Sequence, residues 1–407
     1  MTAIWSLNHK LLNNYNDGLI SAVIQTDLSA AFDTVDHDIL LKKLDHYGIG
    51  GKMNSLLGSF LSNRYQYVSI DGIESKVVQS LPCSVIQGSK LSALLYTIYI
   101  NEVTILHKLM GTNIYEKITQ EILPIKSEII GHEIIQYVDD TNNIIYGNNM
   151  EEIEVYSNNY FKLIESFYTI NKLKLNPDKS CVMVVCRSNR REETKNFVLK
   201  AGKYIIEQSG KIKVFGVYFT AGLSNHANIS NIVSKVNFRL NKMREASKFS
   251  DKRTKIIFLN SMVLSIFRYC SPILIDSEVK TIDKLQTLHM KCTRPILGIK
   301  SFKMSTMNIM SELKILTVQQ MVMKESIQFI HKILFNKSPT SIFNLFTQSN
   351  CNNENIRGVR KFIMKKSHKS NKVTNSLYYR ALYLLNCLES EFCNNNPKKM
   401  SKYLQKI

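Results

Sequence analysis

The sequence has few of the features that build a zinc site or a disulfide framework. Its 407 residues include eight cysteines, but no two of them form a C-x-x-C pair, the spacing on which zinc knuckles usually depend. His289-x-x-Cys292 comes nearest to ligand spacing, and it lies on the apolar side of a helical pattern. Residues on such a side belong to the core far more often than to a metal site. We therefore expect neither a zinc site nor structural disulfides.

Long apolar segments are also missing. No uncharged apolar run approaches the roughly 18 residues that a membrane-spanning helix needs. The N-terminus shows no basic segment followed by an apolar stretch and a small-residue cleavage site. The sequence thus predicts no contact with a membrane and no secretion, and an intracellular protein of the nucleus or the cytoplasm.

Acidic residues are scarce relative to basic ones. Asp and Glu total 33 against 53 Lys and Arg, which gives a formal net charge of +20 at pH 7. The usual partner of so basic a chain is a polyanion, whose bound counterions are displaced by Lys and Arg. Nucleic acid is favoured over an anionic membrane. The 44% apolar content excludes a mostly disordered protein, and the length allows one large core or two to three subdomains.

What the sequence does contain is a pair of adjacent aspartates. Asp139 and Asp140 stand within the run from Glu133 to Tyr146, between two stretches of apolar, β-favouring residues. This pattern predicts a hairpin whose turn presents both carboxylates. Neighbouring carboxylates repel unless a cation lies between them, and a divalent metal with phosphate oxygens is the commonest physiological solution. The pair therefore calls for a third carboxylate.

Asp27 is the candidate for that third carboxylate. It ends the short apolar run Val23-Ile-Gln-Thr-Asp27, and helical spacing follows from Thr34 to Leu44, so we expect it at the C-terminal end of a strand. Three such carboxylates suit two-metal phosphoryl transfer, in which one ion activates the attacking hydroxyl and the other holds the triphosphate. Each aspartate taken alone could equally be a solvated turn residue.

The order of the predicted elements indicates an α+β fold. The pattern predicts an antiparallel sheet covered by helices on one face, with residues 104–133 as a variable insertion. The predicted elements after the Asp27 strand and its helix are a hairpin at Tyr65–Gln79, a helix opened by Gln87-Gly-Ser89, the hairpin with the two aspartates, a helix at Glu152–Ile170, and strands at Val182–Val185 and Val214–Phe219.

After residue 222 the pattern becomes entirely helical, which predicts a separate subdomain beginning near residue 225. Apolar stripes start at Ile229, at Ile256 after a probable cap at Asp251, and at Ile282. A further helix is expected from Val318 to Leu334. The stretch from Arg357 to Lys372 carries seven Lys or Arg and no acid; it is either a solvated segment or a contact to a polynucleotide backbone.

Several of these segments resemble the motifs of reverse transcriptases from non-LTR retrotransposons of the jockey and LINE class. Asp27-Leu-Ser-Ala-Ala-Phe-Asp-Thr-Val-Asp-His37 is similar to the first palm motif, Gln87-Gly-Ser-Lys-Leu91 to the second, and Tyr137-Val-Asp-Asp140 to the third. Asn176-Pro-Asp-Lys-Ser180 is similar to the fourth, and Phe215-Gly-Val217 to the strand beside the primer terminus. The resemblance continues into the C-terminal helices and covers nearly the whole chain.

The resemblance implies a domain order and a reaction. Residues 1–222 would form a polymerase right-hand palm with partial fingers, residues 223–300 an all-helical thumb, and residues 301–407 a basic C-terminal helical region. The chain would be an RNA-directed DNA polymerase, with an RNA template, a DNA primer and a dNTP as partners. The resemblance leaves open a separate chain that supplies fingers or an endonuclease.

The resemblance also implies roles for individual residues. Asp27, Asp139 and Asp140 would hold two Mg²⁺ ions. Lys179 is a candidate to protonate the pyrophosphate leaving group, with a plain surface lysine as the alternative. Phe32 would block a ribose 2′-hydroxyl, or simply belong to the core. The implied substrate contacts are Leu28, through the backbone after Asp27, together with Phe32, Gln87, Gly88 and Tyr137.

The sequence departs from the family pattern in ways that leave two functions open. Asp27 is only 26 residues from Met1, so most of the fingers region is expected to be missing, and Ile86 and Ala93 replace two prolines of the second motif. The intact carboxylate triad favours a polymerase. The departures favour an inactive or repurposed remnant that only binds nucleic acid. A third possibility, an RNA-templated RNA polymerase, is disfavoured by Phe32.

Overall fold

The computed structural model describes residues 1–79, 83–110, 119, 129–201, 204–247, 250–277, 279–298 and 304–345. The described residues form two compact units, one within residues 18–212 and one of residues 1–17 together with the described residues between 213 and 345. No helix in this described part is long and apolar enough to cross a membrane.

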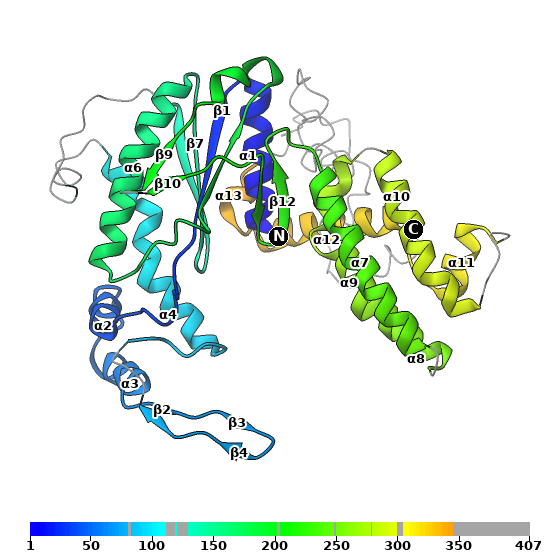
Figure 1. Ribbon diagram of the computed structural model, residues 1–407, viewed down its shortest axis with the longest axis horizontal. Coiled ribbons are helices and arrows are strands. Elements are labelled where there is room, and N and C mark those ends of the chain that lie inside the picture. The colour runs from blue at the N-terminus through cyan, green and yellow to red at the C-terminus, as the bar shows by residue number, and fades with distance from the viewer. Residues whose placement is uncertain are drawn as a thin grey trace, which may run out of the picture. The chain divides into compact units, whose positions relative to one another are not determined.

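The described part of the unit 18–212 is built on a four-stranded antiparallel sheet in the order β6-β7-β1-β8. The two central strands, β7 and β1, lie side by side in Figure 1. Its strands are β1 (Ile20–Thr26), β6 (Gly131–Tyr137), β7 (Asp140–Gly147) and β8 (Cys181–Val185). Their β-branched residues suit a pleated, buried surface. The predicted Asp27 strand and Asp139–Asp140 hairpin are thus confirmed, and they are neighbours in the sheet.

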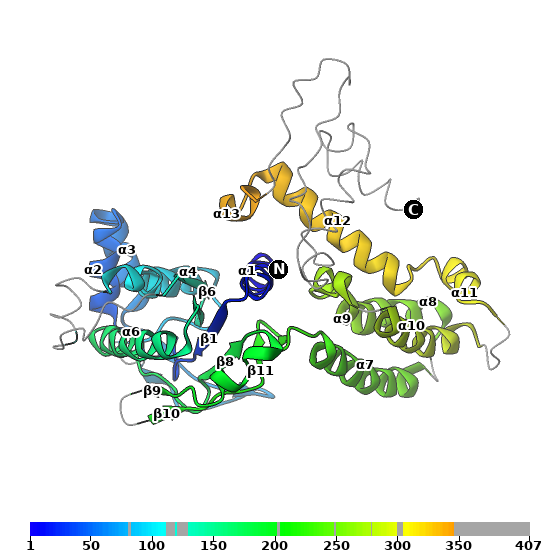
Figure 2. The same ribbon diagram turned by 90° about the horizontal axis from the view of Figure 1, so that it is seen from above.

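Two long helices cover one face of this sheet. Ile20, Ala22 and Ile24 alternate along β1 and share a buried cluster with side chains of α4 (Lys90–Ile100) and α6 (Met150–Ile170). Figure 2 shows α4 and α6 on the same side of β1. Burial of such apolar side chains stabilises the unit by about 2 kcal/mol for each large side chain. The predicted α+β class, with helices on one face of the sheet, is confirmed.

Shorter elements complete this unit. The helix α2 (His37–His46) begins at Asp36, whose carboxylate accepts from the Ile39 N–H at 3.0 Å. The predicted hairpin at Tyr65–Gln79 is confirmed as a long exposed ribbon. The remaining elements are α3 (Gly51–Leu61), β2 (Tyr65–Gln66), β3 (Ser69–Ile70), β4 (Ile73–Glu74), β5 (Val78–Gln79), the 3-10 helices Asn101–Leu109, Ser188–Arg190 and Glu192–Thr194, β9 (Leu199–Ala201) and β10 (Tyr204–Ile206).

The second unit is largely helical. Its elements are α1 (Thr2–Asp17), β11 (Lys211–Val214), β12 (Val217–Thr220), α7 (His226–Ser247), α8 (Lys252–Phe258), a π-helical turn (Leu259–Leu264), α9 (Ser265–Arg268), a 3-10 helix (Ser271–Asp276), α10 (Val279–Thr293), a 3-10 helix (Arg294–Leu297), α11 (Thr306–Leu313), α12 (Val318–Asn336) and α13 (Thr340–Phe343). The predicted stripes on α7, α10 and α12 contribute to one buried cluster. The predicted cap at Asp251 accepts from the Thr254 N–H at 2.9 Å.

The structure corrects one expectation and adds one helix to the predicted elements. The expected single strand Val214–Phe219 is instead the hairpin β11–β12, with Phe215 and Gly216 as its turn. Helix α1 was not expected, and its Trp5 lies in the core of the helical unit, with its ring 6.4 Å from that of Phe329. The boundaries of the two compact units, after residues 17 and 212, place α1 in the helical unit. The predicted domain boundaries after residues 222 and 300 stay predictions. The basic stretch Arg357–Lys372 and most of residues 111–128 lie outside the described residues.

Candidate active site

Two of the predicted carboxylates occupy matching positions on neighbouring strands. In the ladder between β1 and β7, Thr26 faces Thr141. Asp27 directly follows the one threonine, and Asp140 directly precedes the other. Since residues opposite each other in an antiparallel pair lie about 5 Å apart at Cβ, this register brings the two aspartates to one edge of the sheet.

The two aspartates share the face of the sheet that α4 and α6 leave uncovered. The Thr26 hydroxyl lies 3.4 Å from the Tyr168 hydroxyl of α6, so Thr26 points toward the helices. Successive side chains of a strand point to opposite faces. Asp27 and Asp140, each one residue away from this threonine pair, therefore point to the other face.

Asp139 lies in the tight turn that joins β6 to β7. Tyr137 pairs with Asp140, which leaves Val138 and Asp139 as the turn residues. Val138 has φ of 57°, a conformation that a β-branched residue rarely adopts. The turn holds the Asp139 side chain exposed beside the other two carboxylates.

The charges of these aspartates act on one another. Burial raises the pKa of Asp140, and the carboxylates of Asp139 and Asp27 raise it further. Burial also raises the pKa of Asp27, with the Lys179 ammonium lowering it and Asp139 raising it. The Oδ2 atom of Asp27 is buried and has no hydrogen-bond partner within the described part of the chain. The site therefore concentrates negative charge that nothing in the described chain fully neutralises.

The donor atoms of this site fit a divalent cation that prefers oxygen. Carboxylates are the protein ligands that Mg²⁺ uses, and the orphaned Oδ2 of Asp27 is an available donor. Among the described residues, however, no group of three His, Cys, Asp or Glu side chains is close enough to hold a metal ion. The aspartates thus influence one another's charge, but in the described structure their side chains do not come close enough together to ligate one metal ion.

The loop that joins α6 to β8 fixes Asp27. The backbone N–H of Asp27 donates to Ser180 Oγ at 3.2 Å, and its carbonyl accepts from the Asn176 N–H at 2.9 Å. Leu28 forms a β-bridge with Leu175. Lys179 lies on the same loop, which explains how its charge acts on Asp27. The loop therefore positions both the carboxylate and the predicted proton donor.

Three other predicted substrate contacts differ in how far their side chains are buried. The side chain of Leu28 is buried in the core, so only its backbone can face a substrate, as expected. Phe32 is half-buried and stacks on Tyr96 with 4.9 Å between ring centroids, which satisfies the core role and leaves part of the ring accessible. Tyr137 is 65% exposed. These positions are compatible with the predicted roles without testing them.

The predicted second motif lies beside Asp33. Gln87 donates from Nε2 to Asp33 Oδ1 at 3.2 Å. Gly88 has φ of +88°, and the next residue but one, Lys90, begins α4. A glycine is required here because the left-handed region strains other residues. The turn thus brings Gln87 next to the segment that follows Asp27.

Arg64 is a site residue that the sequence analysis did not single out. It lines a cavity of about 530 Å³ together with Asp33, Gln87 and the start of the exposed ribbon. Its guanidinium donates to the Ser84 carbonyl at 2.9 Å and to the Leu61 carbonyl at 2.9 Å. The available signal was a lone arginine in a turn between a helix and a strand, which gives no indication of a site by itself.

Residues 8–219, more than half of the sequence, match the family model for reverse transcriptase (RNA-dependent DNA polymerase). The chain is also similar to telomerase from Candida tropicalis, solved with the TWJ fragment of telomeric RNA, with 12% identity over 77% of this chain and 52% of that one and a TM-score of 0.36. For telomerase from Candida albicans, solved with the same kind of fragment, the values are 12%, 76%, 50% and 0.28. The chain spans about half the length of the telomerase chains it matches.

Proposed function

The chain belongs to the reverse transcriptase (RNA-dependent DNA polymerase) family, and from this we propose that it is the RNA-directed DNA polymerase of a non-LTR retrotransposon. It would transfer a nucleotide from a dNTP to the 3′-hydroxyl of a DNA primer on an RNA template. The observation that carries the proposal is the position of Asp27 and Asp140 at one edge of the sheet, with Asp139 in the adjoining turn.

The carboxylates would bind the metal cofactor. Asp27, Asp139 and Asp140 would hold two Mg²⁺ ions, which when bound supply the Lewis acidity that activates the primer hydroxyl and neutralises the triphosphate. Burial, together with repulsion from the neighbouring carboxylates, raises the pKa of Asp27 and of Asp140, which supports this role. Charges that destabilise one another in the free protein favour a cation between them.

The neighbouring residues would orient the nucleotide. The backbone from Leu28 would face the triphosphate, and Phe32 would leave no room for a 2′-hydroxyl on the sugar. Lys179 would hold a proton near the departing pyrophosphate, where it offsets developing negative charge. Gln87 and Gly88 would line the nucleotide and template side, and Tyr137 would border the primer end. The predicted palm (1–222), thumb (223–300) and C-terminal region (301–407) are part of this proposal.

A second candidate function is a nucleic-acid-binding protein derived from such a polymerase. It is favoured by the lack of a closed three-ligand set among the described residues. The net charge of +20 supports binding of a polyanion under either candidate. A separate chain carrying fingers or an endonuclease would be a partner in the first case and dispensable in the second.

Primer extension separates the two candidates. The full chain is incubated with an RNA template, a labelled DNA primer, dNTPs and Mg²⁺, alongside Asp139→Ala and the matched control Asp38→Ala, an exposed carboxylate of α2. Extension by the parent and by the control, but not by Asp139→Ala, supports the polymerase. Salt-sensitive binding of primer and template without extension supports the binding protein. Preferential incorporation of ribonucleotides would contradict the assigned substrate.

A further inference from the structure

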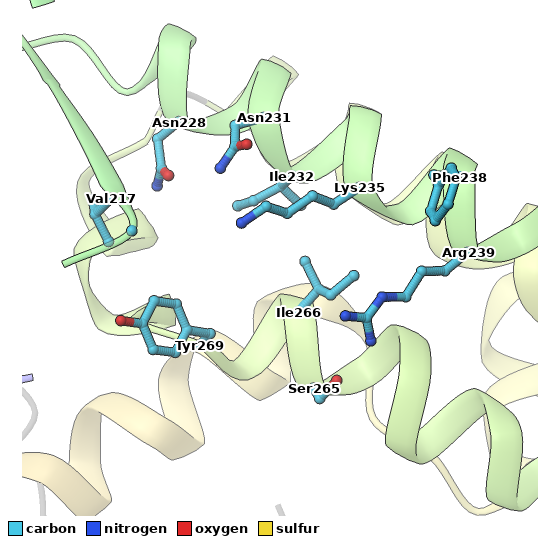
Figure 3. Close-up of a pocket in the computed structure, with 11 residues that line it drawn as sticks. Val217, Asn228, Asn231, Ile232, Lys235, Phe238, Arg239, Ser265, Ile266 and Tyr269 are labelled. Carbon is cyan, nitrogen blue, oxygen red and sulfur yellow. The ribbon is translucent and has the colours of Figure 1, made fainter. Parts of the chain in front are cut away.

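The helical unit contains a cavity of about 400 Å³ between the β11–β12 turn, α7 and α9, and Figure 3 shows the Lys235 ammonium group extending into it. Arg239 also lines this cavity, so its cationic wall suits the nucleic acid of the proposed function. A second polar feature is not used by that function. It is a cluster of buried hydroxyl groups in the unit 18–212, between the sheet and α6.

The hydroxyl cluster consists of Thr26, Thr141 and Tyr168, and all three side chains are buried. Thr26 of β1 and Thr141 of β7 form the last pair of their ladder, so they share one face of the sheet. Tyr168 comes from α6, which covers that face. Asp27 directly follows Thr26, and Asp140 directly precedes Thr141. The cluster therefore lies behind the two aspartates, on the opposite face of the sheet.

The oxygen of Tyr168 faces both threonines. It lies 3.4 Å from Thr26 Oγ1, which is longer than the roughly 2.8 Å of an ordinary O–H···O bond. Burial raises the pKa of Tyr168, and the hydroxyls of Thr26 and Thr141 lower it. Because a phenol donates one hydrogen bond and accepts another, this one oxygen can connect the two strands.

The hydroxyl of Thr141 depends on Tyr168 for such a connection. Its Oγ1 is buried and has no other hydrogen-bond partner among the described residues. A buried hydroxyl that is poorly paired destabilises a protein, whereas valine and phenylalanine would fill the same space without that cost. Stability alone therefore does not explain three hydroxyls at this position in the core.

The cluster also lies where the pairing of β1 with β7 ends. Beyond Thr26 and Thr141 the ladder has no further pair. Burial raises the pKa of Asp140 there, and the charges of Asp139 and Asp27 raise it further. The ends of strands open more readily than their centres because fewer hydrogen bonds hold them. A side-chain connection at the last pair would oppose both this opening and the repulsion between the carboxylates.

We propose that Tyr168 is a positioning residue, whose hydroxyl bridges Thr26 and Thr141 and so fixes the spacing of Asp27 and Asp140. The bridge relates both strand ends to α6, the helix on which they pack. Its importance for nucleotide transfer rests on the proposed function, because there the carboxylates must stay within reach of shared cations. The bridge itself is a property of the folded chain and can be measured without metal or substrate.

Hydrogen exchange followed by mass spectrometry tests the bridge in the full chain. EDTA is present, and nucleic acid and dNTPs are absent, so a failure of the polymerase proposal does not affect the result. Tyr168→Phe removes the oxygen and keeps the ring, and Thr26→Val keeps the shape of the threonine. The matched control is Tyr160→Phe, because Tyr160 is another buried tyrosine of α6 and its hydroxyl has no hydrogen-bond partner among the described residues.

The two bridge variants should open one end of the ladder. In Tyr168→Phe and in Thr26→Val, peptides that cover Thr26 or Thr141 should exchange about fivefold faster than in the parent. Peptides at the other end, which cover Ile20 or Gly147, should exchange at the parental rate. The double variant should be no faster than either single variant, because both changes remove the same bridge. Tyr160→Phe should match the parent throughout.

Primer extension then relates the bridge to the carboxylates. Tyr168→Phe should raise the Mg²⁺ concentration at half-maximal rate by about tenfold and leave the KM for dNTP unchanged. At saturating Mg²⁺ its rate should approach that of the parent. A parent that extends no primer would contradict the proposed function, while hydrogen exchange would still decide whether the bridge exists.

Two results would overturn the inference. The first is parental exchange at the Thr26 end in Tyr168→Phe, or an equal acceleration in Tyr160→Phe, since either would reduce the hydroxyl to ordinary core filling. The second is an unchanged Mg²⁺ requirement together with a lower rate at saturating Mg²⁺. That outcome would show that Tyr168 supports the fold without setting the spacing of the aspartates.

Discussion

Asp27 and Asp140 flank the Thr26–Thr141 pair at the end of the β1–β7 ladder and point to the same face of the sheet. This places two carboxylates at one sheet edge although 112 residues separate them in the sequence. Backbone hydrogen bonds hold them there, so electrostatic repulsion cannot separate them by much. The arrangement has measurable consequences in the absence of metal.

The first consequence is a contribution of these carboxyls to stability that is lost as the pH rises. Because the folded state raises the pKa of Asp27 and of Asp140 above the ordinary 3.8, the protonated carboxyls favour folding at low pH. That contribution is lost as the pH rises from about 3.8 through the raised values. At pH 7 in EDTA, the double variant Asp27→Asn/Asp140→Asn should be more stable than the parent by on the order of 1 kcal/mol.

Urea unfolding at several pH values measures this difference. At pH 3.5 the variant and the parent should have nearly equal midpoints. Asp38→Asn serves as the exposed control, and it should follow the parent at every pH. A double variant that is no more stable than the parent at pH 7 would show that burial and the neighbouring carboxylates do not raise these two pKa values in the folded protein.

Lys179 provides a second prediction. Replacing it with Gln removes the cation that lowers the pKa of Asp27, so the acidic limb of the rate profile for primer extension should move to higher pH. If Lys179 also donates a proton, the rate should fall by about 100-fold. Lys174→Gln, on the same loop and exposed, should change neither quantity. A Lys179→Gln enzyme with the parental profile would reduce this residue to a surface lysine.

Gly216 provides a third prediction. It has φ of +82°, and a Cβ there would meet the Tyr269 ring at 3.5 Å. Gly216→Ala should therefore lower the free energy of unfolding by roughly 1 kcal/mol or more. Gly210→Ala is the control, since nothing lies within 4 Å of a Cβ at that glycine. Equal thermal midpoints for the two variants would contradict the strain assigned to the β11–β12 turn.

His289 provides the fourth prediction. Its ring is fully buried, and neither nitrogen has a hydrogen-bond partner among the described residues. Burial, together with the charge of Arg268, lowers its pKa to about 4. An unfolded chain protonates this histidine near pH 6.5, so stability should fall as the pH falls from about 6.5 to 4.

The variant His289→Leu should lose less stability over that interval. The difference between variant and parent at pH 4 should be on the order of 2 kcal/mol in the free energy of unfolding. His226→Leu, at an exposed position in α7, should retain the pH dependence of the parent. The same acid dependence in His289→Leu would show that this ring does not remain neutral in the folded protein.

The strands that carry the aspartates could be predicted because their pattern is local. Alternating apolar residues on both sides of Asp139 and Asp140 suffice to predict a hairpin, and Asp27 ends an apolar run. These aspartates come together because β1 and β7 are neighbours in the sheet, and the spacing of residues in the sequence does not determine the order of the strands. Ser180, whose hydroxyl accepts from the Asp27 backbone across 153 residues, could not be found from either local pattern.

The errors arose where a local signal was overlooked or had two meanings. The run from Val214 to Phe219 is apolar throughout, so the turn at Phe215 and Gly216 resembled part of a strand, although a glycine in a strand often marks a bend. Helix α1 carries Ile4, Leu7 and Leu11 at helical spacing, a signal that was present in the sequence. The packing of its Trp5 against Phe329 is a tertiary contact, which no local pattern predicts.

The ladder between β1 and β7 also determines how the site tolerates insertions and deletions. Because side chains alternate between faces with a period of two residues, a shift of one residue in β1 would turn Asp27 toward α6 and place Thr26 on the opposite face of the sheet. Single-residue length changes within either strand are therefore far more damaging than most substitutions there. Changes of two residues in register would keep the face but move the carboxylate by about 7 Å along the sheet. Length variation among related chains should consequently be confined to the loops outside these strands.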